Sequence, residues 1–230
     1  MTLLVKNKEV VVPGQVLARG MDFLPSHGTY RRGEEIIADQ VGLLTIDGKV
    51  LKSIPLAGKY LPRKGDTVIG CVIDILMSGW RLDLNGPYSA VLNMKDTKDF
   101  IPLGADLTKY FDLGDYLVCK ITQVTSQNLI DVTARGPGLH KLQGGRIVRV
   151  NPQKVPRIIG KQGSMISLIK DKTKCRIIVG QNGLVWLEGD PKNELVAVKT
   201  FRLIEERSHL RGLTDTVKEF LDQQVKENGL

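Results

Sequence analysis

Short stretches of alternating apolar and polar residues fill the first part of the chain, and none is long enough for an amphipathic helix. Asp47 and Gly48 separate two of these stretches and are typical of a two-residue hairpin turn. The pattern therefore predicts a small all-β domain over residues 1–62. Its expected strands are 10–12, 15–18, 33–38, 42–46 and 49–51.

The same period of two continues in residues 63–136, where a polar stretch (93–113) lies between the third and fourth apolar runs. Five short strands with one longer excursion suit a small closed barrel. The expected strands are 66–76, 80–84, 88–92, 115–124 and 129–134.

Residues 135–145 are rich in Gly and Pro, which is typical of a linker. After this segment, the apolar residues follow the period of helices in some stretches and that of strands in others. The predicted order over 141–212 is βααββα, followed by a C-terminal helix within 213–230. The fold class expected from the whole chain is thus multidomain, mainly β and then α+β. The expected elements are strands 146–150, 175–179 and 184–188 and helices 154–159, 164–172, 191–207 and 215–226.

Positive charge is concentrated in one segment of the chain. The whole protein of 230 residues carries a formal charge of +8, and residues 141–176 alone hold ten Lys and Arg against one acid, Asp171. The first 140 residues contribute a net charge of only +1. A segment this basic indicates a surface that binds a polyanion such as a nucleic acid.

Candidate catalytic and metal-ligating residues are few. Three cysteines and three histidines (His27, His140, His209) are scattered without the spacing of a zinc site or a nucleophilic triad. Asp96 and Asp99 are two carboxylates in one loop, a common coincidence rather than a magnesium centre. We therefore expect no cofactor, no metal and no enzymatic activity.

The sharpest motif is Gly160-Lys161-Gln162-Gly163, between the two short predicted helices of the βααββα unit. Paired glycines let a loop approach a phosphate backbone closely, and the helix that follows adds its positive N-terminus. Together with the basic segment, this arrangement resembles a KH domain, which implies single-stranded RNA binding. The implied contact residues are Arg157, Gly160, Lys161, Gln162, Gly163, Lys170 and Arg176.

The five predicted strands of 63–136 resemble the OB-type barrel of ribosomal protein S-one, an RNA-binding module. Gly65, Asp66, Val68 and Gly70, residues 81–84 and residues 114–118 carry the resemblance. The family's usual third-strand glycine-leucine-valine-histidine stretch is absent, and residues 88–92 replace it. Candidate RNA contacts of the barrel are Trp80, Arg81, Tyr88, Lys95 and Lys98, although the two aromatic residues suit a barrel core equally well.

A small β domain, an S-one-type barrel and one KH domain, in that order, resemble the RNA-binding cap subunits of the archaeal exosome. The resemblance implies a non-catalytic protein, of which three copies, or a mixture with the other cap protein, sit on a hexameric ring of phosphorolytic subunits and guide RNA into its pore. It also implies that residues 1–62 dock on the ring. We expect a cytoplasmic location because the sequence shows no signal-peptide core and no apolar run of membrane-spanning length.

Two other readings remain open at this point. A fragment of polynucleotide phosphorylase would carry both modules, but with the KH domain before the barrel. A stand-alone transcription or translation factor would also combine a barrel with KH modules, although only 23 residues follow Arg207 and a second KH copy would not fit.

Overall fold

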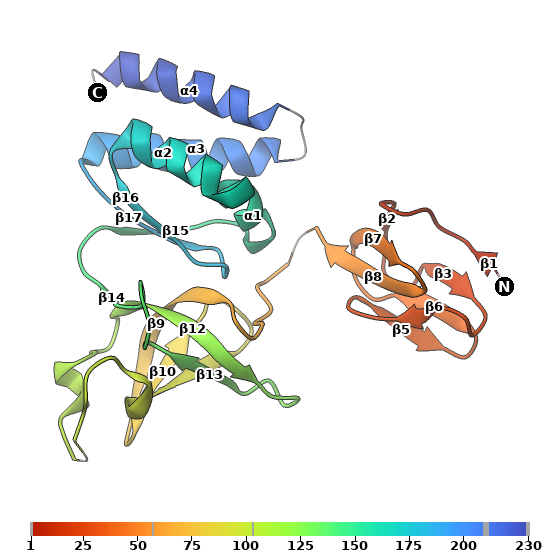
Figure 1. Cartoon of the computed structure of the whole chain (residues 1–230), viewed down its shortest axis with the longest axis horizontal. Helices are drawn as coiled ribbons and strands as arrows, with labels where there is room; N and C mark the ends of the chain where they lie inside the picture. Colours follow the sequence, from red (N-terminus) through yellow and green to blue (C-terminus); the bar gives the residue numbers. More distant parts are fainter. Residues whose placement is uncertain (1, 57, 103, 209–211, 229–230) are drawn as a thin grey trace. The chain divides into compact units, whose positions relative to one another are not determined.

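A computed structural model describes residues 2–56, 58–102, 104–208 and 212–228 (Figure 1). The chain divides into two compact units, Met1–Gly58 and Lys59–Leu230. His209 lies outside the described residues. Among the residues that are described, no helix is long and apolar enough to cross a lipid bilayer.

The first unit consists of two four-stranded sheets, ordered β1-β3-β6-β5 and β2-β7-β8-β4. Leu17 and Ile36 from one sheet and Leu44 and Leu51 from the other share one buried core. The strands are β1 (Thr2–Leu3), β2 (Val10–Val11), β3 (Val16–Arg19), β4 (Leu24–Pro25), β5 (Thr29–Arg32), β6 (Glu35–Ala38), β7 (Gly42–Asp47) and β8 (Val50–Pro55).

The predicted all-β character of this unit is confirmed, with two differences. Strands β1, β4 and β5 were not predicted, because the first two contain only two residues each and β5 is mostly polar. Asp47 pairs with Val50, so the hairpin turn consists of Gly48 and Lys49 and lies one residue later than predicted.

The second unit begins with the predicted five-stranded barrel. Strands β9, β10, β11, β13 and β12 pair in that order, and β12 returns to β9, which closes the barrel. The β11–β13 pair is parallel and the others are antiparallel. The strands are β9 (Thr67–Leu76), β10 (Gly79–Asp83), β11 (Ser89–Asn93), β12 (Tyr116–Val124) and β13 (Ile130–Thr133), each close to its predicted position.

The polar stretch between β11 and β12 contributes to the barrel core. It contains two 3-10 turns, Met94–Asp96 and Leu107–Lys109. Ile101 and Leu107 are buried against the barrel interior. The stretch is therefore a packed excursion that covers part of the core.

The remainder of the second unit has the predicted βααββα order. Its antiparallel sheet is ordered β15-β17-β16, and helices cover one face of this sheet (Figure 1). Phe201 of the long helix and Val217 of the last helix belong to the same buried core. The elements are β15 (Arg146–Arg149), α1 (Val155–Ile159), α2 (Ser164–Thr173), β16 (Arg176–Val179), β17 (Leu184–Glu188), α3 (Pro191–Arg207) and α4 (Leu213–Asn228), with 3-10 turns at Pro152–Lys154 and Lys161–Gly163.

The expected linker is partly structured. Strand β14 (Lys141–Leu142) pairs with β12 at the edge of the barrel, and Lys141 forms an ion pair with Asp115. Leu142 is buried in an apolar cluster that also contains Ile69 of β9 and Trp186 of β17. The segment is therefore part of the junction between the barrel and the following sheet.

Candidate nucleic-acid interface

The loop between α1 and α2 has a backbone that its two glycines make possible. Gly160, Gln162 and Gly163 all have positive φ angles, of 74°, 53° and 81°. The N–H of Gly160 donates to the carbonyl of Pro156 (3.0 Å), and that of Gly163 donates to the carbonyl of Gly160 (3.3 Å). The loop is consequently a defined turn.

Gly160 is required for a second reason besides its φ angle. A Cβ atom at this position would lie 2.7 Å from the backbone nitrogen of Met165, in the first turn of α2. A Cβ at Gly163 would meet only Ile166 Cγ2, at 3.9 Å. The close approach of the loop to α2 thus depends on Gly160, whereas Gly163 mainly permits the left-handed turn.

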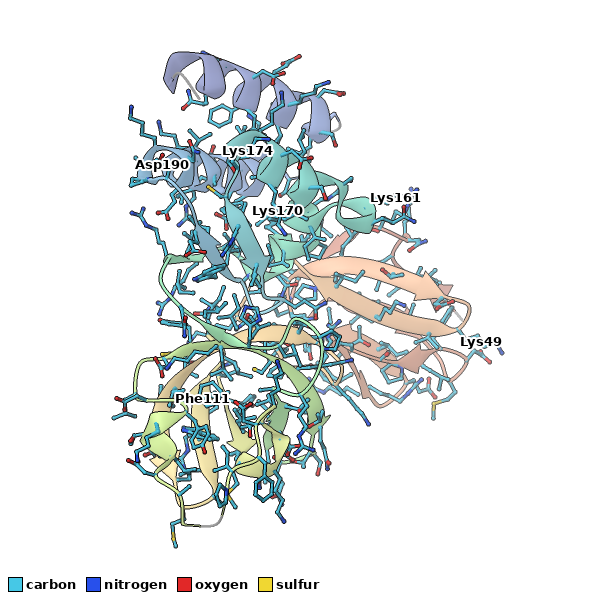
Figure 2. The ribbon with its side chains drawn as sticks, turned by 60° about the vertical axis from the view of Figure 1, so that its left-hand side comes forward. Lys49, Phe111, Lys161, Lys170, Lys174 and Asp190 are labelled. Atoms are coloured by element: carbon cyan, nitrogen blue, oxygen red, sulfur yellow. The ribbon has the colours of Figure 1, made fainter. Side chains whose placement is uncertain are left out.

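Lys161 and Gln162, between the two glycines, are both exposed. Figure 2 shows Lys161 projecting from the loop that precedes α2, with Lys170 further along that helix. Arg157 on α1 is exposed as well. Among the described side chains, Arg157, Lys161 and Lys170 have no acidic partner, so their charges are available to an external anion.

Arg176 has a different environment from these three cations. It begins β16, its side chain is 83% exposed, and its Nη1 lies 3.4 Å from Oε2 of Glu188 on the neighbouring strand. An ion pair this exposed contributes little stability. Arg176 remains free to exchange Glu188 for another anion.

Three partly buried aliphatic residues lie on α1, α2 and β16, the elements that also carry the candidate cations Arg157, Lys170 and Arg176. Ile159 ends α1, Ile166 lies in the first turns of α2, and Val179 ends β16; each packs on the core of this domain and keeps part of its surface exposed. Their exposed surface can contact bases, and the exposed cations on the same elements can contact phosphates. The sequence alone does not identify these three residues, because their apolar periodicity indicates only a core face.

The prediction that Trp80 is available to stack on RNA is wrong. Trp80 is fully buried in the barrel core. Its Nε1 donates to the carbonyl of Phe111 (2.9 Å), and its ring meets the Phe111 ring edge-on, with centroids 5.1 Å apart. The alternative of a core aromatic residue is the correct one for this position.

The other barrel candidates are at the surface. Tyr88, just before β11, is 40% exposed, and Lys95 and Lys98 are exposed in the excursion after β11. Arg81 lies 3.7 Å from Asp74, across the β9–β10 pair. The most exposed aromatic side chain of the barrel is Phe100, at 89%, which no sequence pattern singled out because it lies in a polar stretch.

These barrel residues do not form a basic surface like that of the loop before α2. Asp96 and Asp99 alternate with Lys95 and Lys98 along the same excursion. Within the described part of the chain, no three His, Cys, Asp or Glu side chains are grouped so that they could hold a metal ion.

Two family comparisons match separate parts of the chain. The KH domain family matches residues 146–202, which include the loop, α1, α2 and the three-stranded sheet. The family described as "Exosome complex exonuclease RRP4 N-terminal region" matches residues 10–47, within the first unit.

Comparisons over the whole chain agree with these matches. The "Exosome complex component Rrp4" of Pyrococcus furiosus is 41% identical over 99% of this chain and 89% of its own length. The protein of the same name from Methanothermus fervidus is 40% identical over 97% of this chain and its full length. A crystal structure described as an exosome complex RNA-binding protein is 32% identical, with a TM-score of 0.67, over 74% of this chain and 99% of that one. The chain therefore belongs to the Rrp4 family of exosome complex components.

Proposed function

We propose that this protein is the RNA-binding cap subunit of an exosome that degrades RNA from the 3′ end, and that it binds substrate RNA and guides it to the catalytic subunits. The observation that carries the proposal is the loop of Gly160 to Gly163, with exposed Lys161 and Gln162 and the nearby cations Arg157 and Lys170. A glycine-paired loop of this kind clamps a single-stranded backbone in KH domains.

The proposal includes a division of labour between modules. The KH domain supplies most of the RNA affinity, because it carries the basic segment. The barrel, through Arg81, Tyr88, Lys95 and Lys98, adds weaker contacts. The first unit docks on a hexameric ring of phosphorolytic subunits, three copies of the cap subunit occupy one ring, and the complex works in the cytoplasm.

We also propose that the chain itself is not an enzyme. The family that matches residues 10–47 is described as the N-terminal region of an exosome complex exonuclease, so the absence of catalysis requires a direct degradation assay. Neither the sequence nor the described part of the structure offers a general acid–base pair, a metal site or an ATP phosphate loop. Val155 and Gln162, for example, occupy positions at which such a loop requires Gly and Ser or Thr.

The test combines binding and degradation in one sample. The isolated chain is titrated into fluorescein-labelled single-stranded RNA with magnesium and phosphate present, and the RNA length is then read on a gel. We expect a rise in anisotropy with no shortening of the RNA. Shortening that disappears when one carboxylate of the chain is replaced would contradict the non-catalytic role, and absence of binding would contradict the RNA-binding role.

A further inference from the structure

Two apolar side chains project from one end of the barrel. Met77, in the turn between β9 and β10, is fully exposed, and Phe100, in the excursion after β11, is 89% exposed. The Met94 N–H donates to the Ser78 carbonyl (2.9 Å), which places the turn beside the start of the excursion. Figure 1 shows both segments at the lower end of the barrel. We give the name barrel tip to four exposed residues of these segments: Met77, Lys95, Lys98 and Phe100.

The backbone that carries Phe100 is fixed on both sides of this residue. Thr97 is buried, its Oγ1 lies 2.9 Å from the carbonyl oxygen of Asp99, and its own carbonyl accepts from Nε of Arg135 (2.8 Å). On the other side, Ile101 is buried in the barrel core. The ring of Phe100 is therefore presented to solvent from an ordered segment, and a ligand that binds on it has little chain left to order.

We infer that the barrel tip stacks on unpaired bases of RNA, at a site separate from the strand surface that carries Arg81. This inference rests on the proposed function, in which the chain binds single-stranded RNA. Proteins hold single strands by combining aromatic side chains, on which bases of any sequence stack, with cations that follow the backbone. Phe100 supplies the aromatic ring, and the polarisable thioether of Met77 adds a second surface that suits an aromatic partner.

Charge determines how the barrel tip contributes to binding. Lys95 and Lys98 are exposed, but Asp96 and Asp99 lie on the same stretch of chain and offset them. Attraction of phosphates therefore contributes little here, and stacking supplies the contact. Removal of the Phe100 ring should consequently lower RNA affinity without changing its salt dependence, which reports phosphate contacts.

The size and composition of the barrel tip argue against a protein as its occupant. Two apolar side chains cover far less than the roughly 800 Å² per partner of a stable protein interface. The centres of such interfaces also contain few lysines. A site of this size suits one or two bases of a strand that the KH loop also holds.

The barrel tip lies at the opposite end of β9 from the contact with the KH domain. The Gln181 N–H donates to the carbonyl of Thr67, the first residue of β9 (3.0 Å), whereas Met77 follows the last residue of this strand. Because β9 has 10 residues, it extends over roughly 30 Å. An RNA that contacts both the KH domain and the barrel tip must bridge a distance of this order.

The first test compares Phe100→Ala with Leu129→Ala, a matched control whose side chain is 61% exposed just before β13, at the other end of the barrel. Each variant is titrated into labelled single-stranded RNA of about 20 nucleotides, which is long enough to bridge the two sites. We expect Phe100→Ala to weaken binding at least about fivefold, the effect of one lost stacking contact. Its slope of log affinity against log salt should equal that of the parent, and Leu129→Ala should bind like the parent.

A fluorescence measurement tests the contact directly. In Phe100→Trp the new indole is exposed, whereas Trp80 and Trp186 are buried. RNA should therefore quench the emission of Phe100→Trp and leave that of Leu129→Trp unchanged. Melting temperatures equal to that of the parent should show that these surface variants are folded.

Other outcomes would overturn the inference. If the parent binds RNA, Phe100→Ala binds it equally and Phe100→Trp is not quenched, the barrel tip does not contact RNA, although the proposed function stands. If the parent itself does not bind RNA, the proposed function fails first. A lower salt slope for Phe100→Ala would contradict stacking as the source of the affinity. A parent that is dimeric by light scattering and becomes monomeric with Phe100→Ala would assign the barrel tip to a second copy of the chain.

Discussion

The side-chain amide of Asn182 bonds both main-chain polar groups of Ile69, across the junction between the KH sheet and the barrel. Its Oδ1 accepts from the Ile69 N–H (3.3 Å), and its Nδ2 donates to the Ile69 carbonyl (2.7 Å) and to that of Leu84 (2.8 Å). Asn182 is fully buried. Because buried polar groups are costly when unpaired, these bonds fix the KH domain on the barrel.

Replacing Asn182 with Ala should destabilise the second unit by about 3 kcal/mol, because each main-chain group of Ile69 and Leu84 that is left buried and unpaired costs roughly 1–3 kcal/mol. Urea unfolding followed by tryptophan fluorescence measures this, since Trp80 and Trp186 both lie in this unit. Gln181→Ala is the control, because its side chain is exposed. An unchanged urea midpoint for Asn182→Ala would show that the junction is not held by these bonds.

Trp80 should matter for stability and not for RNA binding. Trp80→Ala removes a fully buried ring and should cost about 3–5 kcal/mol, whereas Trp80→Phe keeps most of the core filled. We expect Trp80→Phe to bind single-stranded RNA within about twofold of the parent. A large loss of RNA affinity in a variant with a normal melting curve would restore Trp80 as a contact residue.

The sequence allowed the strands of the barrel and the order of the KH elements to be predicted, because their apolar periods are regular. The junction could not be predicted. Asn182 lies in a short turn flanked by glycines. The local sequence of such a turn is the same whether the side-chain amide is solvated or bonds a distant strand. The Gly-rich segment before β15 also reads as a linker, although Leu142 and Gly144 take part in the junction, the latter as acceptor for Trp186 Nε1.

The KH loop was predictable because glycine spacing, local charge and helix order all indicate the same structure. In the barrel, the alternating pattern of β10 is the same whether the ring of Trp80 faces bases or the core. Phe100 lies in the excursion after β11, outside any strand, so no strand period could predict that it is exposed. Within the strands of the first unit, register fixes which face a residue occupies. Register between β7 and β8 could be inferred from their hairpin only to within one residue.

Thiol chemistry provides a third prediction. Burial raises the pKa of Cys119 to about 12, and burial also raises the pKa values of Cys71 and Cys175. At pH 8 each thiol should therefore be less ionised than a free cysteine, and less reactive. Iodoacetamide labelling followed by mass spectrometry tests this. In the native protein we expect slow labelling of Cys71, the only one of the three that is not buried, and in guanidinium we expect labelling of all three. Native labelling of Cys119 at the rate of Cys71 would contradict this packing.

Salt dependence tests the contribution of single cations. Lys170→Gln should reduce the slope of log affinity against log salt by roughly 0.7, the value for one phosphate contact of a single strand. Lys49→Gln, in the exposed turn after β7, is the control and should leave the slope unchanged. Cutting the chain before the KH domain is a poorer test, because it would expose Ile69 and Val118 of the junction cluster. Equal slopes for parent and Lys170→Gln would remove Lys170 from the interface.

The most direct test of the central claim is RNA titration of the double variant Lys161→Asp with Gln162→Asp at fixed salt. Both residues are exposed, and Gly160 and Gly163 are retained. The free energy of unfolding should therefore change by no more than about 0.5 kcal/mol, the usual limit for an exposed substitution. A control with Lys49→Asp and Gln127→Asp makes the same charge change at two other exposed turns. We predict that the loop variant loses RNA affinity at least fivefold for every sequence tested, because backbone contacts carry no sequence information, while the control stays near the parent. Equal affinities of loop variant, control and parent, with unchanged melting, would show that this loop does not hold RNA.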